Sequence, residues 1–149
     1  MTITIISVGT KPTREVDVLI QDYLRRLPKH IIVKWQFIRH GSGDPKSSVA
    51  QESEAIMRIL TDQGKVILLD ETGVSLTSPQ LSNLLFDTGI DTTFIIGGAY
   101  GVSEQIRQRA NIVLSFGNLV FPHQLMRLIL VEQLYRTYTI HIGHPYHHN

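Results

Sequence analysis

The sequence predicts an α/β protein with a mostly parallel sheet flanked by helices. β-Branched apolar segments alternate along the chain with segments of helical apolar spacing, and the connections between them are short. The apolar segments are nearly continuous runs of Val, Ile and Leu, as in strands buried on both faces. With 149 residues, 42% of them hydrophobic and 18% charged, the chain has the size and composition of one domain, residues 1–149.

The strand and helix segments follow one another in regular alternation. Strands are expected at residues 2–8, 31–38, 65–70, 92–98 and 111–116. Helices are expected at residues 14–27, 48–60, 78–89, 103–110 and 122–140. Each helix follows one strand, which is the order of a parallel sheet with crossover connections.

Short sequence signals set the expected helix boundaries. Ser48 and Gln51 have the spacing of a capping box at the start of the second helix. The segment 39–48 before it contains two glycines and a proline and is expected to be a long, mobile loop. Ser78 and Pro79 are a suitable N-cap and first helical residue, and Gly89 is suited to end that helix.

Charge and composition exclude several classes of protein. The net charge is +1 and the pI is about 8.1, so a nucleic-acid site would have to be local or doubled by dimerisation. The absence of cysteine excludes disulfides, thiol nucleophiles and iron–sulfur clusters. The first ten residues lack the basic segment and cleavage site of a signal peptide, and no apolar run reaches the roughly 18 residues that span a bilayer. We therefore expect a cytoplasmic protein without a membrane partner.

In the segment FIIGGAYGVS, residues 94–103, the apolar run of the fourth strand stops at two adjacent glycines, Gly97 and Gly98, and a third follows at Gly101. Ligands of α/β proteins usually bind at such a strand-to-helix turn. A dinucleotide turn would need G-x-G-x-x-G after the first strand and an acidic residue about 20 positions later, and neither is present. No Lys-Ser or Lys-Thr completes a P-loop, and no G-x-S-x-G supplies a hydrolase nucleophile. The open alternatives are a different ligand loop and glycines that only permit a tight turn.

A second unusual loop follows the fifth strand. Leu119, Val120 and Phe121 are apolar residues in a position where loops are normally polar. Such a loop suits a planar heterocycle that is recognised by main-chain hydrogen bonds, or else it is a buried connection.

Taken together, these segments and others along the chain resemble the RlmH (YbeA-like) family of SPOUT-class methyltransferases. The resemblance rests on SVGT, YLRRLPK, LLDETG, IIGGAYG, LSFGNLVFPHQLMRLILVEQLYR and the terminal HPYHHN, which occur in order along nearly the whole chain. It implies methylation of N3 of a pseudouridine in 23S, large-subunit ribosomal RNA by a homodimer that uses S-adenosyl-L-methionine. It also implies a trefoil knot in the C-terminal half, which is a rare exception to the usual rules of chain connection.

The resemblance further implies where the cofactor binds. In this family the cofactor lies among the loops of the knot, and the glycines allow the backbone to approach it closely. The matching positions in this chain are Leu69, Gly97, Gly98, Gly101, Phe116, Gly117, Asn118, Leu119, Val120 and Phe121.

The expected catalytic residues are His123, Arg127 and Tyr146. N3 of a uracil-type ring must lose its proton before it attacks a methyl group, and neutral histidine is suited to accept that proton near pH 7. Arg127 lies four residues after His123, on the same helix face, and is expected to grip a phosphate or carboxylate. The resemblance implies that the tail carrying Tyr146 completes the site of the partner subunit.

The expected RNA contacts are Arg25, Arg26, His144 and His147, drawn from a basic segment and from the tail. The tail, residues 144–149, is polar and has little reason of its own to be ordered. No metal is expected, because a short tail broken by glycine and proline, without cysteine or a nearby carboxylate, is a poor zinc site.

Two other functions remain open. One is a non-catalytic RNA- or ribosome-binding protein of the same fold. The other is a small-molecule α/β enzyme that uses the glycine loop for phosphate.

Overall fold

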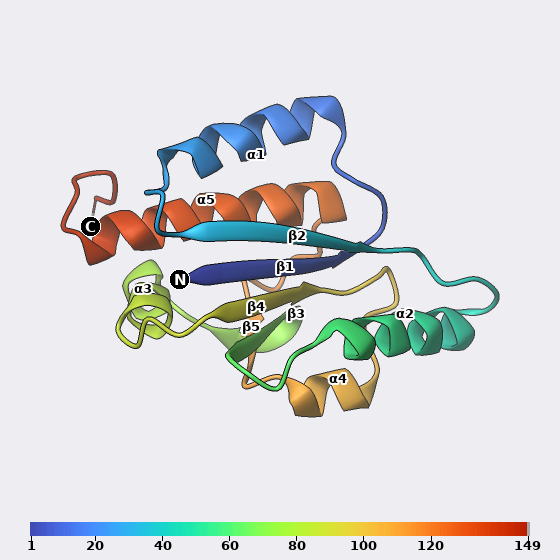
Figure 1. Cartoon of the computed structure of the whole chain (residues 1–149). Coiled ribbons are helices and arrows are strands. Elements are labelled where there is room, and N and C mark those ends of the chain that lie inside the picture. The colour runs from blue at the N-terminus through green and yellow to red at the C-terminus, as the bar shows by residue number, and fades with distance from the viewer. Residues whose placement is uncertain (149) are drawn as a thin grey trace.

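The computed structural model describes residues 1–148 and consists of three layers, with a sheet between two layers of helices (Figure 1). Its strands are β1 (Thr2–Val8), β2 (Ile32–Ile38), β3 (Lys65–Ser75), β4 (Thr92–Ile96) and β5 (Ile112–Ser115). They lie in the order β2-β1-β4-β3-β5, and all neighbours pair in parallel. The predicted fold class is confirmed. Because the strands are parallel, their carboxyl ends share one edge of the sheet, which we call the carboxyl edge.

Helices cover both faces of this sheet. The helices are α1 (Arg14–Arg26), α2 (Pro45–Ile59), α3 (Ser78–Phe86), α4 (Glu104–Arg109) and α5 (His123–His141). Helices α1, α3 and α5 share one apolar cluster with Ile3 and Ile5 of β1, whereas α2 and α4 share another with Ile6 and Val8. The division arises because successive side chains of a strand point to opposite faces.

The start of α2 differs from the prediction. Helix α2 begins at Pro45, and the side chain of Asp44 accepts a 2.7 Å hydrogen bond from the backbone N–H of Ser47. Ser48 lies within the helix and is buried, so the predicted capping box is wrong. The loop is consequently shorter than expected, residues 39–44. Asp44 followed by proline is the stronger start signal, because aspartate caps the helix and proline fits its first turn.

Two other boundaries are corrected. Thr77, not Ser78, is the N-cap of α3, and it forms a capping box with Gln80. Strand β3 continues to Ser75, beyond the predicted end at residue 70, with a shift of register between Leu69 and Val74. After this shift the extension still pairs with β5, through Val74 with Leu114 and Ser75 with Ser115.

No helix among residues 1–148 is long and apolar enough to cross a membrane. The trefoil knot stays a prediction.

Candidate active site

A cavity of about 820 Å³ opens at the carboxyl edge, where β3, β4 and β5 end. It is lined by nine of the ten predicted cofactor residues: Leu69, Gly97, Gly98, Gly101, Phe116, Gly117, Leu119, Val120 and Phe121. Asn118 is not part of the lining. Three segments that are far apart in the sequence therefore meet around one space large enough for a nucleoside-sized ligand.

The glycine loop forms one wall. The N–H of Gly101 donates a 3.0 Å hydrogen bond to the carbonyl of Gly98, and Gly101 has φ +78°, a conformation that favours glycine. A Cβ on Gly98 would lie 2.2 Å from a carboxylate oxygen of Glu52. That side of Gly98 therefore faces Glu52 on α2, so a substitution there would first displace a protein side chain.

The apolar loop after β5 forms the opposite wall. The hydroxyl of Ser115 donates to the carbonyl of Gly117 at 2.8 Å and accepts from its N–H at 3.0 Å, which fixes the turn. Leu119 is 72% exposed and Val120 is 81% exposed, although both are apolar. Exposed apolar side chains beside a cavity mark a surface that a ligand or partner covers.

A charged pair that the sequence reasoning missed lines the same cavity. Asp70 follows the apolar part of β3, and Arg107 of α4 donates hydrogen bonds to Asp70 and, at 3.4 Å, to Thr72. Burial alone would raise the pKa of Asp70, but hydrogen bonds from Thr72 and the charge of Arg107 outweigh it, and the pKa lies below its ordinary value. The available signal was the acidic pair in LLDETG directly after an apolar strand.

His123 lies at the rim of the cavity, at the first position of α5. Its Nδ1 is 3.4 Å from the carbonyl oxygen of Val8, at the end of β1. A ring nitrogen facing a carbonyl carries the proton in the neutral imidazole, so the other nitrogen, Nε2, keeps a free lone pair. This arrangement suits a general base.

Arg127 does not have the expected geometry. Its side chain is 1% exposed, and its nitrogens donate to Ser7 Oγ at 2.8 Å, Thr10 O at 2.6 Å and Val8 O at 3.0 Å. The guanidinium also lies 5.2 Å from the ring centre of Phe37. Its donors thus bind the end of β1, and the expectation that it grips a substrate phosphate or carboxylate is wrong for this structure.

The tail is more ordered than expected. Tyr146 donates a 3.2 Å hydrogen bond to Glu132 and packs edge-on against Tyr135, with ring centres 4.8 Å apart. The Arg136 guanidinium lies 4.9 Å from the Tyr146 ring and 3.4 Å from Nδ1 of His147. The earlier expectation counted only apolar periodicity and missed these polar and aromatic contacts with α5. Asn149 lies outside the described residues.

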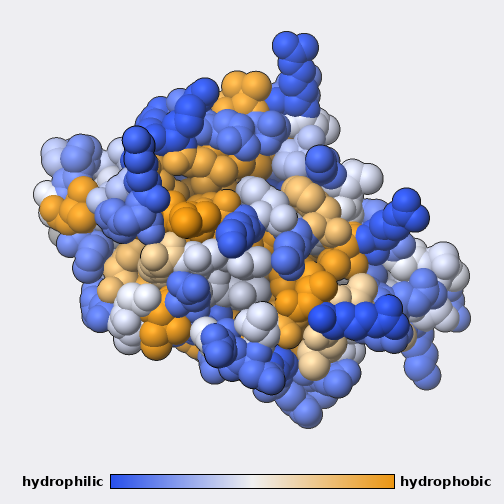
Figure 2. All heavy atoms as spheres, in the orientation of Figure 1, coloured by the Kyte–Doolittle hydropathy of each residue, from blue (hydrophilic) through white to orange (hydrophobic). Residues whose placement is uncertain are grey.

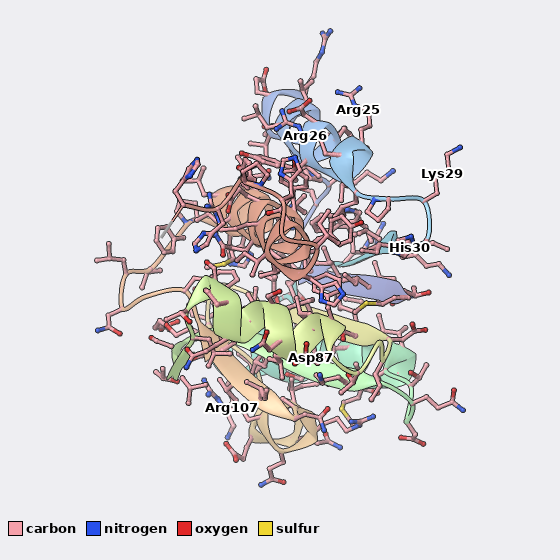
Figure 3. The ribbon with its side chains drawn as sticks, turned by 90° about the vertical axis from the view of Figure 1, so that its left-hand side faces the viewer. Arg25, Arg26, Lys29, His30, Asp87 and Arg107 are labelled. Carbon is pink, nitrogen blue, oxygen red and sulfur yellow. The ribbon has the colours of Figure 1, made fainter. Side chains whose placement is uncertain are left out.

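The predicted RNA contacts gather at the end of the molecule away from this chain's cavity. Figure 3 shows Arg25 and Arg26 at the end of α1, with Lys29 and His30 following, while Arg107 lies on the other side of the sheet. Arg26 lies 5.8 Å from the Tyr135 ring, which joins this group to the tail. Glu132 and Arg136, one turn apart on α5, form an ion pair at 2.6 Å. Within residues 1–148, no group of three or more metal-binding side chains is close enough to hold a metal ion.

A family model described as "Predicted SPOUT methyltransferase" matches residues 1–147. The chain belongs to the SPOUT methyltransferase family. SPOUT methyltransferases use S-adenosyl-L-methionine, so the chain is an S-adenosylmethionine-dependent methyltransferase, as expected.

Individual relatives agree with this assignment. The chain is 36% identical to "Ribosomal RNA large subunit methyltransferase H" of Laribacter hongkongensis (strain HLHK9), over 99% of both chains. It is 39% identical to the protein of the same name from Clostridium botulinum (strain Kyoto / Type A2), again over 99% of both. A solved structure of a probable methylase family protein from Haemophilus influenzae Rd KW20 aligns with a TM-score of 0.61, covering 99% of this SPOUT chain and 70% of that one. At 10% identity, that likeness concerns the fold alone.

Proposed function

We propose that this SPOUT methyltransferase methylates N3 of a pseudouridine in 23S ribosomal RNA, as a homodimer. The observation that carries the proposal is the position of His123. It lies at the rim of a cavity formed by the glycine loop and the apolar loop, and its Nε2 is free to accept a proton. The printed names of the relatives supply the substrate class, large-subunit ribosomal RNA.

The cavity fits S-adenosyl-L-methionine. Leu119, Val120 and Phe121 offer apolar surface to the adenine ring, and the main chain of residues 97–101 and 116–117 offers N–H and C=O groups to its polar edges. Asp70 and Arg107 lie on the wall as an ion pair, so the wall offers the cofactor polar groups of both signs. When bound, the cofactor supplies an electrophilic methyl group.

The chain's own residues then prepare the nucleobase. Nε2 of His123 accepts the N3 proton, so that the N3 lone pair becomes available, and Val8 O stabilises the resulting imidazolium through Nδ1–H. Arg127 positions this base indirectly, because it donates to the same Val8 carbonyl and holds the end of β1 in place. The exposed apolar side chains Leu119 and Val120 exclude water around the transfer once a ligand or partner covers them.

The length of α5 favours a site shared between two subunits. Glu132, which accepts the Tyr146 hydrogen bond, lies about 14 Å along the helix axis from His123. Tyr146, His144 and His147 therefore lie far from their own subunit's cavity, and they serve a site only if they belong to the partner's. Exposed apolar residues on the neighbouring helices α1 and α5, Val18, Leu19 and Leu125, offer surface for that dimer.

The test is transfer of labelled methyl groups from S-adenosyl-L-methionine to ribosomes from a strain that lacks the protein. Digestion and mass spectrometry should locate the label at N3 of one pseudouridine. RNA binding without any transfer would contradict the proposal and favour the non-catalytic alternative. Label on another atom or another RNA would also contradict it.

A further inference from the structure

The carboxyl edge continues beyond the cavity, over the ends of β1 and β2. The segments that follow these strands, and the helix starts next to them, carry the cations Lys11, Arg14, Arg39 and Lys46. All four are exposed, and none forms a salt bridge within the part of the chain that the structure describes. We call these four residues the cationic rim. Figure 2 shows hydrophilic side chains projecting on the right of the view, where β2 continues into its loop in Figure 1.

Backbone contacts bring the segments of the rim together. Val8 pairs with Ile38, and the N–H of Gly9 donates a 2.7 Å hydrogen bond to the carbonyl of Ile38, so the chains leaving β1 and β2 run side by side. A Cβ on Gly9 would lie 3.1 Å from Nε2 of His40. Lys11 and Arg39 are therefore carried by adjacent segments.

The loop after β2 is held in a defined conformation. Glu52 is 5% exposed and accepts a 2.9 Å hydrogen bond from the N–H of Gly41. Gln51 accepts from the N–H of Ser42 at 3.2 Å and donates to its carbonyl at 3.1 Å. These bonds fix the loop against α2, so Arg39 and Lys46 project from a fixed backbone. The expectation of a mobile loop does not fit this bonding.

The rim adjoins the proposed base. The N–H of Thr13 donates a 3.2 Å hydrogen bond to Gln124, the residue after His123. The cofactor cavity uses the β4, β3 and β5 part of the carboxyl edge, whereas the rim lies on the β1 and β2 part, with His123 between them. The exposed carboxylates of this edge, Glu15 and Asp44, are fewer than the cations, and Asp44 is engaged in capping α2.

We propose that the cationic rim binds phosphates of the RNA strand flanking the target nucleotide. The inference rests on the proposed function, because it needs an RNA whose base reaches His123. N3–H of a uracil-type base forms the Watson–Crick hydrogen bond, so the target must be unpaired, and its flanking strand has to cross the free part of the carboxyl edge. Phosphate contacts there position the strand without reading its sequence.

The test compares two double variants of the full chain with the same change in net charge. Lys11→Gln with Arg39→Gln removes two rim cations, and Arg58→Gln with Arg109→Gln removes two cations at the other edge, where α2 and α4 end. Each phosphate contact to a single strand contributes about 0.7 to the slope of log K against log salt. The rim variant should lose about 1.4 in slope and bind ribosomal RNA about 25-fold more weakly at 0.1 M salt.

The control should stay within about twofold of wild type, by the usual weakness of surface pairs. Thermal melts and calorimetry should show unchanged folding and S-adenosyl-L-methionine affinity for the rim variant, while its kcat/KM for RNA falls. Equal losses in both variants would overturn the inference, because net charge alone would explain them. An unchanged slope in the rim variant, with active wild-type enzyme, would also overturn it. A wild type that neither binds nor methylates RNA would overturn the proposed function and this inference with it.

Discussion

Replacing Arg127 with alanine should destabilise the fold rather than weaken RNA binding directly. The guanidinium is 1% exposed and donates to Ser7 Oγ, Val8 O and Thr10 O. Burial lowers its pKa below the ordinary value, but an arginine stays protonated at neutral pH. Alanine leaves the three acceptors without this donor and opens a cavity beside Phe37.

The magnitude follows from these contacts. A hydrogen bond to a charged group contributes about 1.5–3 kcal/mol, so three would contribute up to about 9 kcal/mol. Removing the buried charge also removes its desolvation cost, and water can reach Thr10, so the expected net loss is about 4 kcal/mol. For 149 residues the entropy of unfolding is about 0.3 kcal/mol/K, which converts this loss into a fall in Tm of about 13 °C.

Thermal melts followed by circular dichroism measure this shift, with two comparisons. Arg127→Lys keeps the charge but cannot make all three bonds, so its Tm should fall about half as far. Arg58→Ala is the matched control, because that side chain is 73% exposed and its loss should cost less than about 0.5 kcal/mol. The structural role would be refuted if the Tm of Arg127→Ala stayed within about 2 °C of wild type while the salt slope for RNA binding fell by about 0.7. That result would support the original expectation that Arg127 binds a phosphate.

The remaining predictions concern the base, the charged pair and the tail. His123→Ala should slow single-turnover transfer by about 10²- to 10⁴-fold while cofactor affinity by calorimetry stays near wild type, and a loss below about tenfold would place the base elsewhere. The folded pKa of Asp70 lies below 3.8, so its charge stabilises the fold above pH 3.8 and ceases to do so as the pH falls through the folded pKa. Asp70→Asn should therefore shrink the difference in Tm between pH 6 and pH 3. The exposed control Asp62→Asn should leave that difference unchanged. Deleting residues 144–149 should lower Tm modestly, through loss of the Tyr146 contacts, and should abolish methyl transfer. Mixing this shortened chain with the His123→Ala chain should restore activity in heterodimers. Verified heterodimers without activity would show that the tail serves its own subunit.

Local patterns in the sequence were sufficient for the order of the strands and helices and for locating the two loops that form the cavity, but not for every boundary. Strand β1 has the predicted bounds, residues 2–8, because a β-branched run bounded by Gly9 is a complete local signal. The glycines of residues 97–101 stood out because they interrupt an apolar run, and Leu119 to Phe121 because loops are normally polar, whereas their role in binding the cofactor was implied by the family resemblance. Their meeting in one cavity follows from the parallel strands, which place both loops at the carboxyl edge.

The roles of Arg127 and Asp70 could not be predicted in this way. Arg127 pairs with residues near the N-terminus, and Asp70 pairs with Arg107, so both depend on which strands become neighbours. The strand order β2-β1-β4-β3-β5 departs from sequence order, and hydrophobic periodicity does not predict which strands become neighbours. Knowing which face of a helix carries an arginine also does not tell whether its side chain binds a ligand or is buried against the protein's own backbone.

The carbonyl of Val8 explains why a structural arginine and a proposed base belong to the same stretch of α5. It lies 3.0 Å from Nη2 of Arg127 and 3.4 Å from Nδ1 of His123, so one acceptor at the end of β1 fixes both side chains. Arg127 adds two further bonds to Ser7 and Thr10, and these hold the acceptor itself in place. The tautomer of His123, and hence the free lone pair on Nε2, depends on that carbonyl. The spacing of four residues between them places both on one helix face, so that the anchor orients the base without touching the substrate.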